Sequence, residues 1–230
     1  MNLIMDVATK ISFIENLPLF NCLDQAGKQQ LADCMELRTK RKYSFVYMPD
    51  EVSTHLFFLT KGNVKIGTHS SDGREVIKAI LHPTAMFGEL GLVGEESRQD
   101  FARAMNEEVE LIVVKVDDFQ KLMETNHSLC LRVISLMGKR LRRAENRLES
   151  LIFKDARTRI VDFLKDSVEK RGRKVGFEML LKHSLTQQDI ANLTGTSRQT
   201  VTSVLNDLRK SDLIYFNRRS ILIRDLANLA

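Results

Sequence analysis

The sequence has only three cysteines among its 230 residues, which limits the kinds of site that it can form. Cys22, Cys34 and Cys130 lie far apart, and none of them belongs to a Cys-x-x-Cys pair. The odd number and the wide spacing exclude a disulfide framework and a paired-cysteine metal site. We therefore expect free thiols in a reducing compartment.

The sequence also lacks the segments that send a chain to or across a membrane. It contains no run of about 18 apolar residues that could span a bilayer. Its N-terminal residues do not form a basic-then-apolar signal, because Asp6, Lys10 and Glu15 interrupt the pattern. We therefore expect a cytoplasmic protein without a membrane partner.

Motifs that would indicate an enzyme are absent. The sequence has no nucleophile elbow, no phosphate-binding loop and no His-Glu-x-x-His zinc motif. Its five histidines are scattered without metal-ligand spacing: His55, His69, His82, His127 and His183. The sequence therefore predicts no catalytic residues, no metal site and no enzymatic activity.

Charge of one sign is only slightly in excess. The sequence has 35 Lys and Arg residues against 30 Asp and Glu residues, which gives a formal net charge of +5. This balance permits a polyanionic partner without requiring one. The 43% of hydrophobic residues is enough, in a chain of this length, for a sizeable core and two domains.

Hydrophobic periodicity predicts helices at the start of the chain and strands after them. Apolar residues recur at helical spacing up to Pro18, and the helical pattern resumes over residues 25–35. Short apolar runs follow, separated by turn signals at 61–63 and 70–73. These runs are residues 44–47, 55–59, 64–66, 76–81 and 109–114. Many short strands without intervening helices predict an antiparallel barrel or sandwich.

From Asp117 the pattern is helical again, and apolar residues step by four and three from Cys130 to Leu151. Such a heptad pattern fits a helix packed on its own domain or a helix that pairs with its copy. The length and regularity favour a homodimer, whose predicted seam is Ile134, Met137, Leu141, Ala144, Leu148 and Leu151. A further amphipathic helix is predicted over 154–168, and a charged surface loop over 169–174.

Residues 185–223 contain two short helical patterns on either side of a turn at Gly195. Thr186 can cap the first helix, because Asp189 follows three residues later as in a capping box. Ala191 is small, which lets a second helix cross closely. Gly195 suits a turn that requires a positive φ. These signals predict two helices joined by a tight turn.

The second helix of this pair carries side chains that can read DNA. Thr196 or Ser197 can cap it, with Gln199 in the reciprocal position after Thr196. Its inward side chains are predicted to be Val201, Val204, Leu205 and Leu208. Near its start, the outward residues are Arg198, Gln199 and Ser203. Arginine matches guanine O6 and N7 and glutamine matches adenine, so these residues are predicted to read base edges.

Neighbouring polar residues are suited to hold the DNA backbone. The predicted phosphate contacts are Thr186, Gln188, Ser197, Thr200, Arg218 and Arg219. The two arginines lie in a turn at 217–219 between apolar runs at 213–216 and 220–223, a hairpin that would form a wing. The alternative is an ordinary helical hairpin with a solvated charged face. Two caps, a glycine turn and a wing favour a helix-turn-helix that binds double-stranded DNA.

Three parts of the sequence resemble the superfamily of the cyclic-AMP receptor protein and the fumarate-nitrate reduction regulator, called CRP/FNR below. They are the Phe-Gly-Glu-Leu-Gly-Leu segment at 87–92, the heptad helix and the Thr-Ser-Arg-Gln-Thr-Val segment at 196–201. The resemblance covers nearly the whole length. It implies an α+β fold with a cyclic-nucleotide-binding-type β-roll, which is an antiparallel jelly roll, a long central dimerisation helix and a C-terminal winged helix-turn-helix. The implied parts are 1–125, 126–153 and 154–230, and RNA polymerase is an expected partner.

The resemblance also implies a place for an effector, with Gly88, Glu89, Leu90, Arg98 and Gln99 as candidate pocket residues. In the cyclic-AMP receptors a Gly-Glu pair helps to bind the ribose, and Gly88 and Glu89 match it. Their phosphate-binding Arg-Ser-Ala or Arg-Thr-Ala segment reads Arg98-Gln99-Asp100 here. A carboxylate beside a phosphate costs about 1–4 kcal/mol at ~4 Å.

The residues that contact adenine differ as well. Those relatives use a Thr-Ser pair on the dimer helix, and the corresponding residues here are Ala144 and Glu145. Two interpretations follow. The first is a regulator whose effector is absent or unidentified, with Glu89 pairing with Arg98 across an empty pocket. The second is a cyclic-AMP-dependent regulator with a divergent pocket, or a cyclic-nucleotide-binding module of a larger system.

We favour the first interpretation and predict no cofactor, with a cyclic nucleotide kept as the alternative. An iron–sulfur cluster would need clustered N-terminal cysteines, which Cys22 and Cys34 do not provide. A haem would need an axial His or Cys ligand, and the scattered histidines offer no pattern for one.

Overall fold

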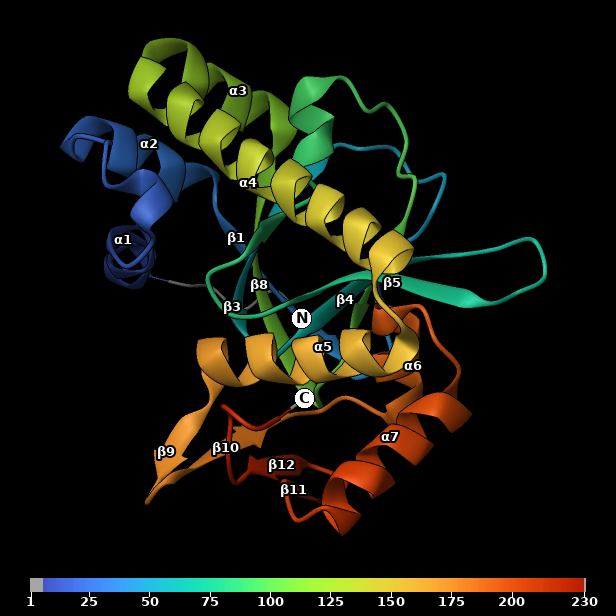
Figure 1. Ribbon diagram of the computed structural model, residues 1–230. Coiled ribbons are helices and arrows are strands. Elements are labelled where there is room, and N and C mark those ends of the chain that lie inside the picture. The colour runs from blue at the N-terminus through green and yellow to red at the C-terminus, as the bar shows by residue number, and fades with distance from the viewer. Residues whose placement is uncertain (1–5, 230) are drawn as a thin grey trace. The chain divides into compact units, whose positions relative to one another are not determined.

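The computed structural model describes residues 6–229, which form helices and antiparallel strands (Figure 1). The chain divides into two compact units. The first comprises residues 1–68 and 78–142, and the second comprises residues 69–77 and 143–230. Within the described residues, no helix is both long enough and apolar enough to cross a membrane.

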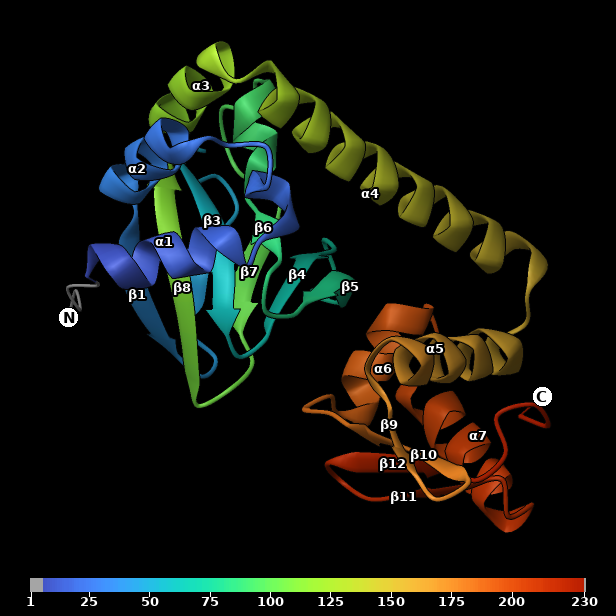
Figure 2. The same ribbon diagram turned by 90° about the vertical axis from the view of Figure 1, so that its left-hand side faces the viewer.

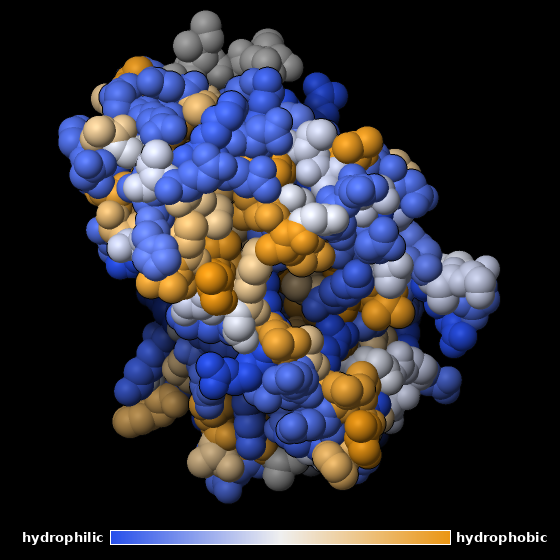
Figure 3. Space-filling model, turned by 90° about the horizontal axis from the view of Figure 1, so that it is seen from above, coloured by the Kyte–Doolittle hydropathy of each residue, from blue (hydrophilic) through white to orange (hydrophobic). Residues whose placement is uncertain are grey.

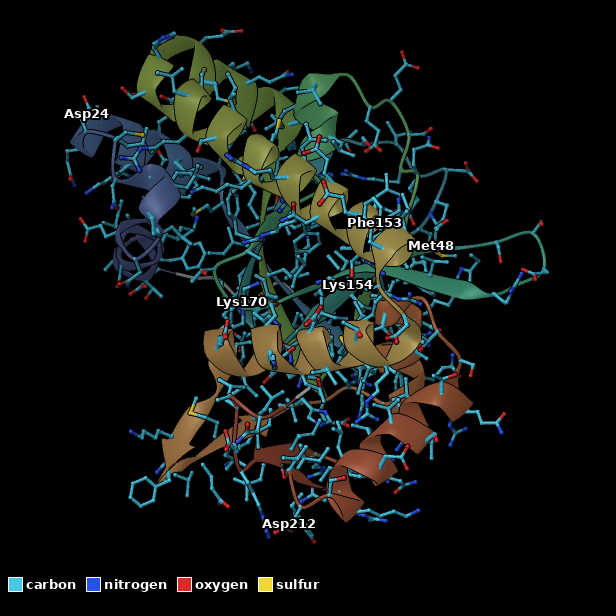
Figure 4. All side chains as sticks on the ribbon, in the orientation of Figure 1. Asp24, Met48, Phe153, Lys154, Lys170 and Asp212 are labelled. Carbon is cyan, nitrogen blue, oxygen red and sulfur yellow. The ribbon has the colours of Figure 1, made fainter. Side chains whose placement is uncertain are left out.

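The first unit begins with helices, as the periodicity predicts. They are α1 (Val7–Glu15), the 3-10 turn η1 (Pro18–Phe20) and α2 (Gln25–Cys34). Asp24 lies at the start of α2 (Figure 4) and accepts a hydrogen bond from the Gly27 N–H at 2.8 Å. Such a cap satisfies a backbone donor that has no partner within the helix. The predicted helical break at Pro18 is confirmed, because α1 ends at Glu15 and a separate 3-10 turn begins at Pro18.

The strands between Glu36 and Lys115 form two antiparallel sheets with the orders β1-β8-β3-β6 and β2-β7-β4-β5. Their bounds are β1 (Glu36–Arg41), β2 (Phe45–Tyr47), β3 (His55–Lys61), β4 (Val64–His69), β5 (Glu75–Leu81), β6 (Met86–Phe87), β7 (Phe101–Ala104) and β8 (Glu108–Lys115). All five predicted strand runs are confirmed. The apolar runs did not predict β1, because its sequence Glu-Leu-Arg-Thr-Lys-Arg is mostly charged, nor the very short β6 and β7.

Side chains of β3 and β8 alternate between two apolar clusters, as a period of two requires. In β8, Val109, Leu111 and Val113 join the cluster that also contains residues of β4 and β7. Ile112 and Val114 lie on the other face of β8 and join a second cluster, with residues of α1, α2 and the helix after β8. Figure 2 shows α1 lying across the strands on this side. The two clusters make the first unit a β-roll with helices packed on its outer face.

Two helices follow the β-roll, α3 (Val116–Thr125) and α4 (His127–Phe153). The predicted long helix is confirmed, and α4 is 27 residues long. Of its apolar side chains, Leu129 and Val133 are buried, and Met137 packs against the helix-side cluster of the first unit. Figure 3, seen from above, shows hydrophobic surface (orange) exposed among hydrophilic residues (blue).

The second unit combines three helices with a four-stranded antiparallel sheet of order β11-β12-β10-β9. Phe153 and Lys154 lie where α4 ends (Figure 4). The remaining elements are α5 (Ala156–Arg171), β9 (Arg173–Val175), β10 (Glu178–Lys182), α6 (Gln187–Thr194), α7 (Arg198–Lys210), β11 (Ile214–Phe216) and β12 (Ser220–Ile223). Asp155 caps α5 by accepting a hydrogen bond from the Thr158 N–H at 2.7 Å.

The predicted surface loop at 169–174 is wrong. Helix α5 continues to Arg171, and strand β9 begins at Arg173 and pairs with β10. Glu169, Lys170 and Arg171 are exposed on the last helical turn, where Lys170 pairs with Asp166, and the other two charges of the segment lie in β9. Val168 in the same turn is buried and holds the helix on the unit. A charged segment with one glycine therefore fits a helix end as well as a loop.

Candidate nucleic-acid interface and effector pocket

Helix α6 begins and ends at the residues that the sequence predicts. The Thr186 hydroxyl accepts a hydrogen bond from the Asp189 N–H at 3.0 Å, and the Asp189 carboxylate accepts one from the Thr186 N–H at 2.9 Å. The capping box is therefore confirmed. The helix ends at Gly195, whose φ is +63°. This left-handed conformation strains any residue with a Cβ, and a Cβ at Gly195 would also displace the end of the Leu151 side chain, which lies 2.7 Å from that position.

Helix α7 is capped by Ser197, which accepts a hydrogen bond from the Thr200 N–H at 3.0 Å. The predicted reciprocal role of Gln199 is wrong, because the cap is Ser197 and its third helical residue is Thr200. Gln199 is exposed instead. The predicted inward residues are confirmed as buried: Val201, Val204, Leu205 and Leu208. This packing turns the opposite side of α7 outward.

The outward side of α7 forms a shallow hollow of about 590 Å³. It is lined by Arg198, Gln199, Thr202, Ser203 and Asn206. The structure therefore brings together the three predicted base-reading residues and adds Thr202 and Asn206. Thr202 lies four residues after Arg198, and Asn206 lies eight residues after it. This spacing places all three on one helical face, so the sequence alone could have indicated the two additional residues.

The residues predicted to contact phosphates lie at the helix starts and in the wing. Thr186, Ser197 and Thr200 use their hydroxyls within the two caps. Gln188 lies along α6, where its amide N–H donates to the Asn192 side chain at 2.8 Å. Gln187 was not among the predicted residues, and its amide oxygen accepts a hydrogen bond from the Thr202 hydroxyl at 2.7 Å. That bond ties the start of α6 to the middle of α7.

The predicted wing is a hairpin of β11 and β12, and β10 pairs with β12 on its other side. The side chain of Asn217 organises the turn, because its oxygen accepts hydrogen bonds from the N–H groups of Arg219 at 2.8 Å and Ser220 at 2.9 Å. Arg218 and Arg219 are exposed in this turn. The wing therefore presents two cationic side chains to solvent.

Two arginines from outside the helix pair hold the end of α6. Arg147 of α4 donates to the Leu193 carbonyl at 2.6 Å, and Arg159 of α5 donates to the Thr194 carbonyl at 2.8 Å. Cationic side chains stabilise a helix C-terminus, where backbone carbonyls lack partners and carry partial negative charge. These contacts join residues far apart in the sequence, so no local pattern predicted them.

The predicted dimer seam lies along α4. Ile134, Leu141, Ala144, Leu148 and Leu151 are exposed, and Leu141 and Leu148 expose 62% and 60% of their surface. Met137 differs, because it is half-buried against the core of the first unit. Apolar residues that recur every seven residues on an exposed helix face are typical of helices that pair.

In the β-roll, the Gly-Glu pair lies between β6 and the 3-10 turn η2 (Glu89–Val93). Gly88 has a φ of +76°, and a Cβ there would lie 3.0 Å from the His55 carbonyl oxygen. The Glu89 side chain is buried and forms an ion pair with Arg140 of α4, which also donates to the Met86 carbonyl. The predicted pairing of Glu89 with Arg98 is therefore wrong.

Arg98 is 3% exposed and bonds to the backbone of the first unit. Its guanidinium donates to the Gly88 carbonyl at 3.0 Å and to the His55 carbonyl at 2.5 Å. It also lies 3.7 Å from the Glu95 carboxylate and 4.6 Å from the centre of the Tyr47 ring. Arg98 therefore joins the strands around it instead of reaching Glu89.

Asp100 is held by two neighbours. It accepts a hydrogen bond from the Tyr47 hydroxyl at 3.2 Å and pairs with Lys78 at 3.1 Å. Burial raises the pKa of Tyr47, and the Asp100 carboxylate raises it further, so the hydroxyl keeps its proton and donates.

Gln99 and Leu90, the remaining candidate pocket residues, are both exposed. The Gln99 amide donates a hydrogen bond to the Ser97 carbonyl at 3.2 Å.

Two family models match the chain. The model described as "Cyclic nucleotide-binding domain" matches residues 37–126, and the model described as "Crp-like helix-turn-helix domain" matches residues 158–230. The chain belongs to the CRP/FNR family of transcription regulators. This family consists of DNA-binding regulators, so the predictions of the fold class and of a protein that is not an enzyme are confirmed.

Individual CRP/FNR relatives align over most of the chain. A CRP-like cAMP-activated global transcriptional regulator of Mycobacterium tuberculosis is 32% identical over 185 residues, which cover 80% of this chain and 82% of the relative. The cAMP-activated global transcriptional regulator Vfr of Pseudomonas aeruginosa is 30% identical over 84% of this chain and 91% of that protein. A solved structure of a CooA variant from Carboxydothermus hydrogenoformans has a TM-score of 0.73 at 26% identity, and the match covers 86% of this chain and 87% of that one.

A cyclic nucleotide is the effector that this family's domain implies, and the residues of the β-roll do not fit one. A cyclic phosphate needs an anion site, but Arg98 directs its guanidinium to two carbonyls and a carboxylate. Asp100 in the same segment is paired with Lys78, and Glu89 is paired with Arg140. Among residues 6–229, no group of three or more His, Cys, Asp or Glu side chains could hold a metal ion.

Replacing Arg98 with Met is expected to lower the free energy of unfolding by about 3 kcal/mol, because the Gly88 and His55 carbonyls lose their hydrogen-bond donor and Glu95 loses its neighbouring cation. Urea unfolding followed by circular dichroism measures the change. Arg74→Met is the matched control, since Arg74 pairs with Asp72 on an exposed turn, and a change under about 0.5 kcal/mol is expected there. Equal stabilities of the two variants would contradict the structural role of Arg98.

Proposed function

We propose that the protein is a homodimeric transcription regulator whose two α7 helices read a pseudo-palindromic operator in the major groove. The observation that carries this proposal is the outward face of α7, where Arg198, Gln199 and Ser203 line one open hollow next to the helix start. Arginine and glutamine side chains at the start of such a helix match the donor and acceptor pattern of base edges. The caps of α6 and α7 and the wing turn would position the DNA backbone.

The proposed dimer is supported by the exposed seam of α4. Ile134, Leu141 and Leu148 lie seven residues apart and expose apolar side chains to solvent. Pairing with a second copy would bury this surface, and each leucine fully buried stabilises by about 1.5–3 kcal/mol. A two-fold dimer would place two recognition helices about one DNA turn apart, roughly 34 Å, which requires a symmetric operator.

The proposal divides the chain into three parts. Residues 1–125 would form the sensor, 126–153 the dimerisation helix and 154–230 the DNA-binding part. RNA polymerase is the further partner that this proposal expects. We infer that the signal is not a cyclic nucleotide, because the internal bonds of Arg98, Asp100 and Glu89 leave no anion site of the kind that a cyclic phosphate requires.

Selection of duplexes from a random library by the full-length protein tests this function. The expected product is a sequence with two inverted half-sites, and its enrichment should not change when cyclic AMP or cyclic GMP is added. Sedimentation of the free protein should give the mass of a dimer. A monomer that enriches no sequence would contradict the proposal.

Titration calorimetry with cyclic AMP should give no binding heat up to about 100 μM ligand, because the Arg98 guanidinium is already engaged with two backbone carbonyls and the Glu95 carboxylate. The Mycobacterium tuberculosis relative serves as the positive control, since its name describes it as cAMP-activated. Saturable heat with a micromolar Kd would show that the β-roll rearranges around the nucleotide and would contradict the prediction.

A further inference from the structure

The reading face of α7 extends two helical turns beyond Arg198, to Asn206. The two residues are eight positions apart, which corresponds to roughly 12 Å along the helix axis. Both line the same hollow. Base pairs in a duplex are spaced by about 3.4 Å, so this separation corresponds to three or four base pairs.

The orientation of the Asn206 amide is set by a neighbouring arginine. Arg209 donates a hydrogen bond to the Asn206 side-chain oxygen at 3.0 Å. The Arg209 guanidinium also lies over the Phe216 ring of β11, 5.3 Å from its centre. A cation over an aromatic face is attracted to it, so Phe216 holds Arg209 in place on the other side.

This arrangement changes what an asparagine can read. A side-chain amide offers one acceptor oxygen and an NH₂ group with two donors. An unrestrained asparagine bonds to adenine with both groups, accepting from N6 and donating to N7. The amide oxygen keeps a second lone pair when it bonds to Arg209, but the bond turns that oxygen towards Arg209 and leaves the NH₂ group on the opposite side of the amide. Two donors facing a base match guanine, which offers two acceptors in the major groove, O6 and N7.

We propose that Asn206 is a specificity-determining residue that selects guanine, three or four base pairs from the base that Arg198 reads, and that Arg209 is its positioning residue. This inference rests on the proposed function, since it requires α7 to enter the major groove. Thymine, with a single acceptor at O4, ranks second, and adenine and cytosine rank below it.

The test uses the full-length protein and the operator that it selects. Binding of wild type, Asn206→Ala and Asn206→Asp is measured on operators that carry each of the four bases at every half-site position. Asn206→Ala is expected to remove the preference at one position, a loss of roughly five- to a hundredfold, and to leave the Arg198 position unchanged. Asn206→Asp, which only accepts, should reverse the base order there towards cytosine and adenine.

The positioning role of Arg209 is tested by the base preference of Arg209→Ala. Arg209→Ala frees the Asn206 oxygen, so the preference at the same position is expected to move from guanine to adenine, which a general loss of stability would not produce. For Asn206→Ala, the matched control is Asn228→Ala, because Asn228 bonds to Asp225 outside α7. This control is expected to keep the base preference of wild type. Thermal unfolding of each variant checks that it is folded.

The outcomes separate this inference from the function on which it rests. A wild-type protein that selects no sequence overturns both. An operator that wild type selects but that Asn206→Ala binds equally well overturns the inference alone. A uniform loss across all bases assigns Asn206 to a phosphate contact and also overturns it.

Discussion

Replacing Leu141 and Leu148 together with glutamate is expected to make the protein monomeric and to lower its affinity for the selected operator more than a hundredfold. Both side chains are exposed on one face of α4, at equivalent positions of successive heptads. In the proposed dimer the double variant would place four carboxylates in an apolar seam. Burying a charge without a partner costs far more than the leucine contacts contribute.

The loss of DNA affinity follows from the loss of the dimer. A monomer carries one recognition helix and can occupy one half-site, whereas linked helices gain roughly 100- to 10,000-fold from the second, intramolecular contact. Sedimentation velocity and gel-shift titration measure the two effects. Because neither leucine belongs to a buried cluster in the free chain, the folded protomer should keep its circular dichroism spectrum.

The matched control is Ser135→Glu with Asn146→Glu, which adds the same charge to exposed positions of α4 outside the seam. This control is expected to remain dimeric and to bind the operator as wild type does. A dimer that survives the leucine replacements would place the protein's self-association elsewhere and contradict the proposed seam.

Replacing Arg198 with Ala is expected to cost about 1–3 kcal/mol of binding free energy for each half-site and to relax the preference at one base. Arg198 is exposed on the first turn of α7, and the hollow next to it leaves room for a base edge. The planar guanidinium can donate two parallel hydrogen bonds to guanine, which alanine cannot replace.

Arg198→Lys separates base reading from simple attraction to phosphate. Lysine keeps the positive charge but lacks the two parallel donors of the guanidinium. The variant should therefore lose its preference for one base, while its DNA affinity keeps the same dependence on salt concentration. Arg173→Ala removes an exposed charge from β9 and should leave the base preference intact. If Arg198→Ala binds the selected operator as tightly as wild type, Arg198 does not read a base.

Local signals in the sequence predicted most of the helix-turn-helix. The capping residues, the glycine turn and the inward apolar positions of α7 depend on neighbours within four residues, and such patterns can be read directly. The exception is the cap of α7, where Thr196 and Ser197 both fit the pattern. The wing turn was predicted for the same reason, because Asn217 bonds to the two residues that follow it closely.

The contacts that define the β-roll pocket were harder to predict. The expected partner of Glu89 was Arg98, nine residues later, but the structure pairs Glu89 with Arg140, which is 51 residues away. Each arginine can satisfy a buried carboxylate, and sequence alone does not show which one the fold brings close. The replacement of the phosphate-binding motif by Gln99 and Asp100 was visible in the sequence, whereas the bonds of Asp100 to Tyr47 and Lys78 required the structure.

The hydrogen bond between Thr202 and Gln187, together with the crowded turn at Gly195, has a consequence for how such a regulator can change its targets. The angle between α6 and α7 is fixed by internal contacts, so the two helices must approach DNA as one rigid body. A new operator preference therefore has to arise by exchanging surface side chains of α7, while the scaffold beneath them stays the same.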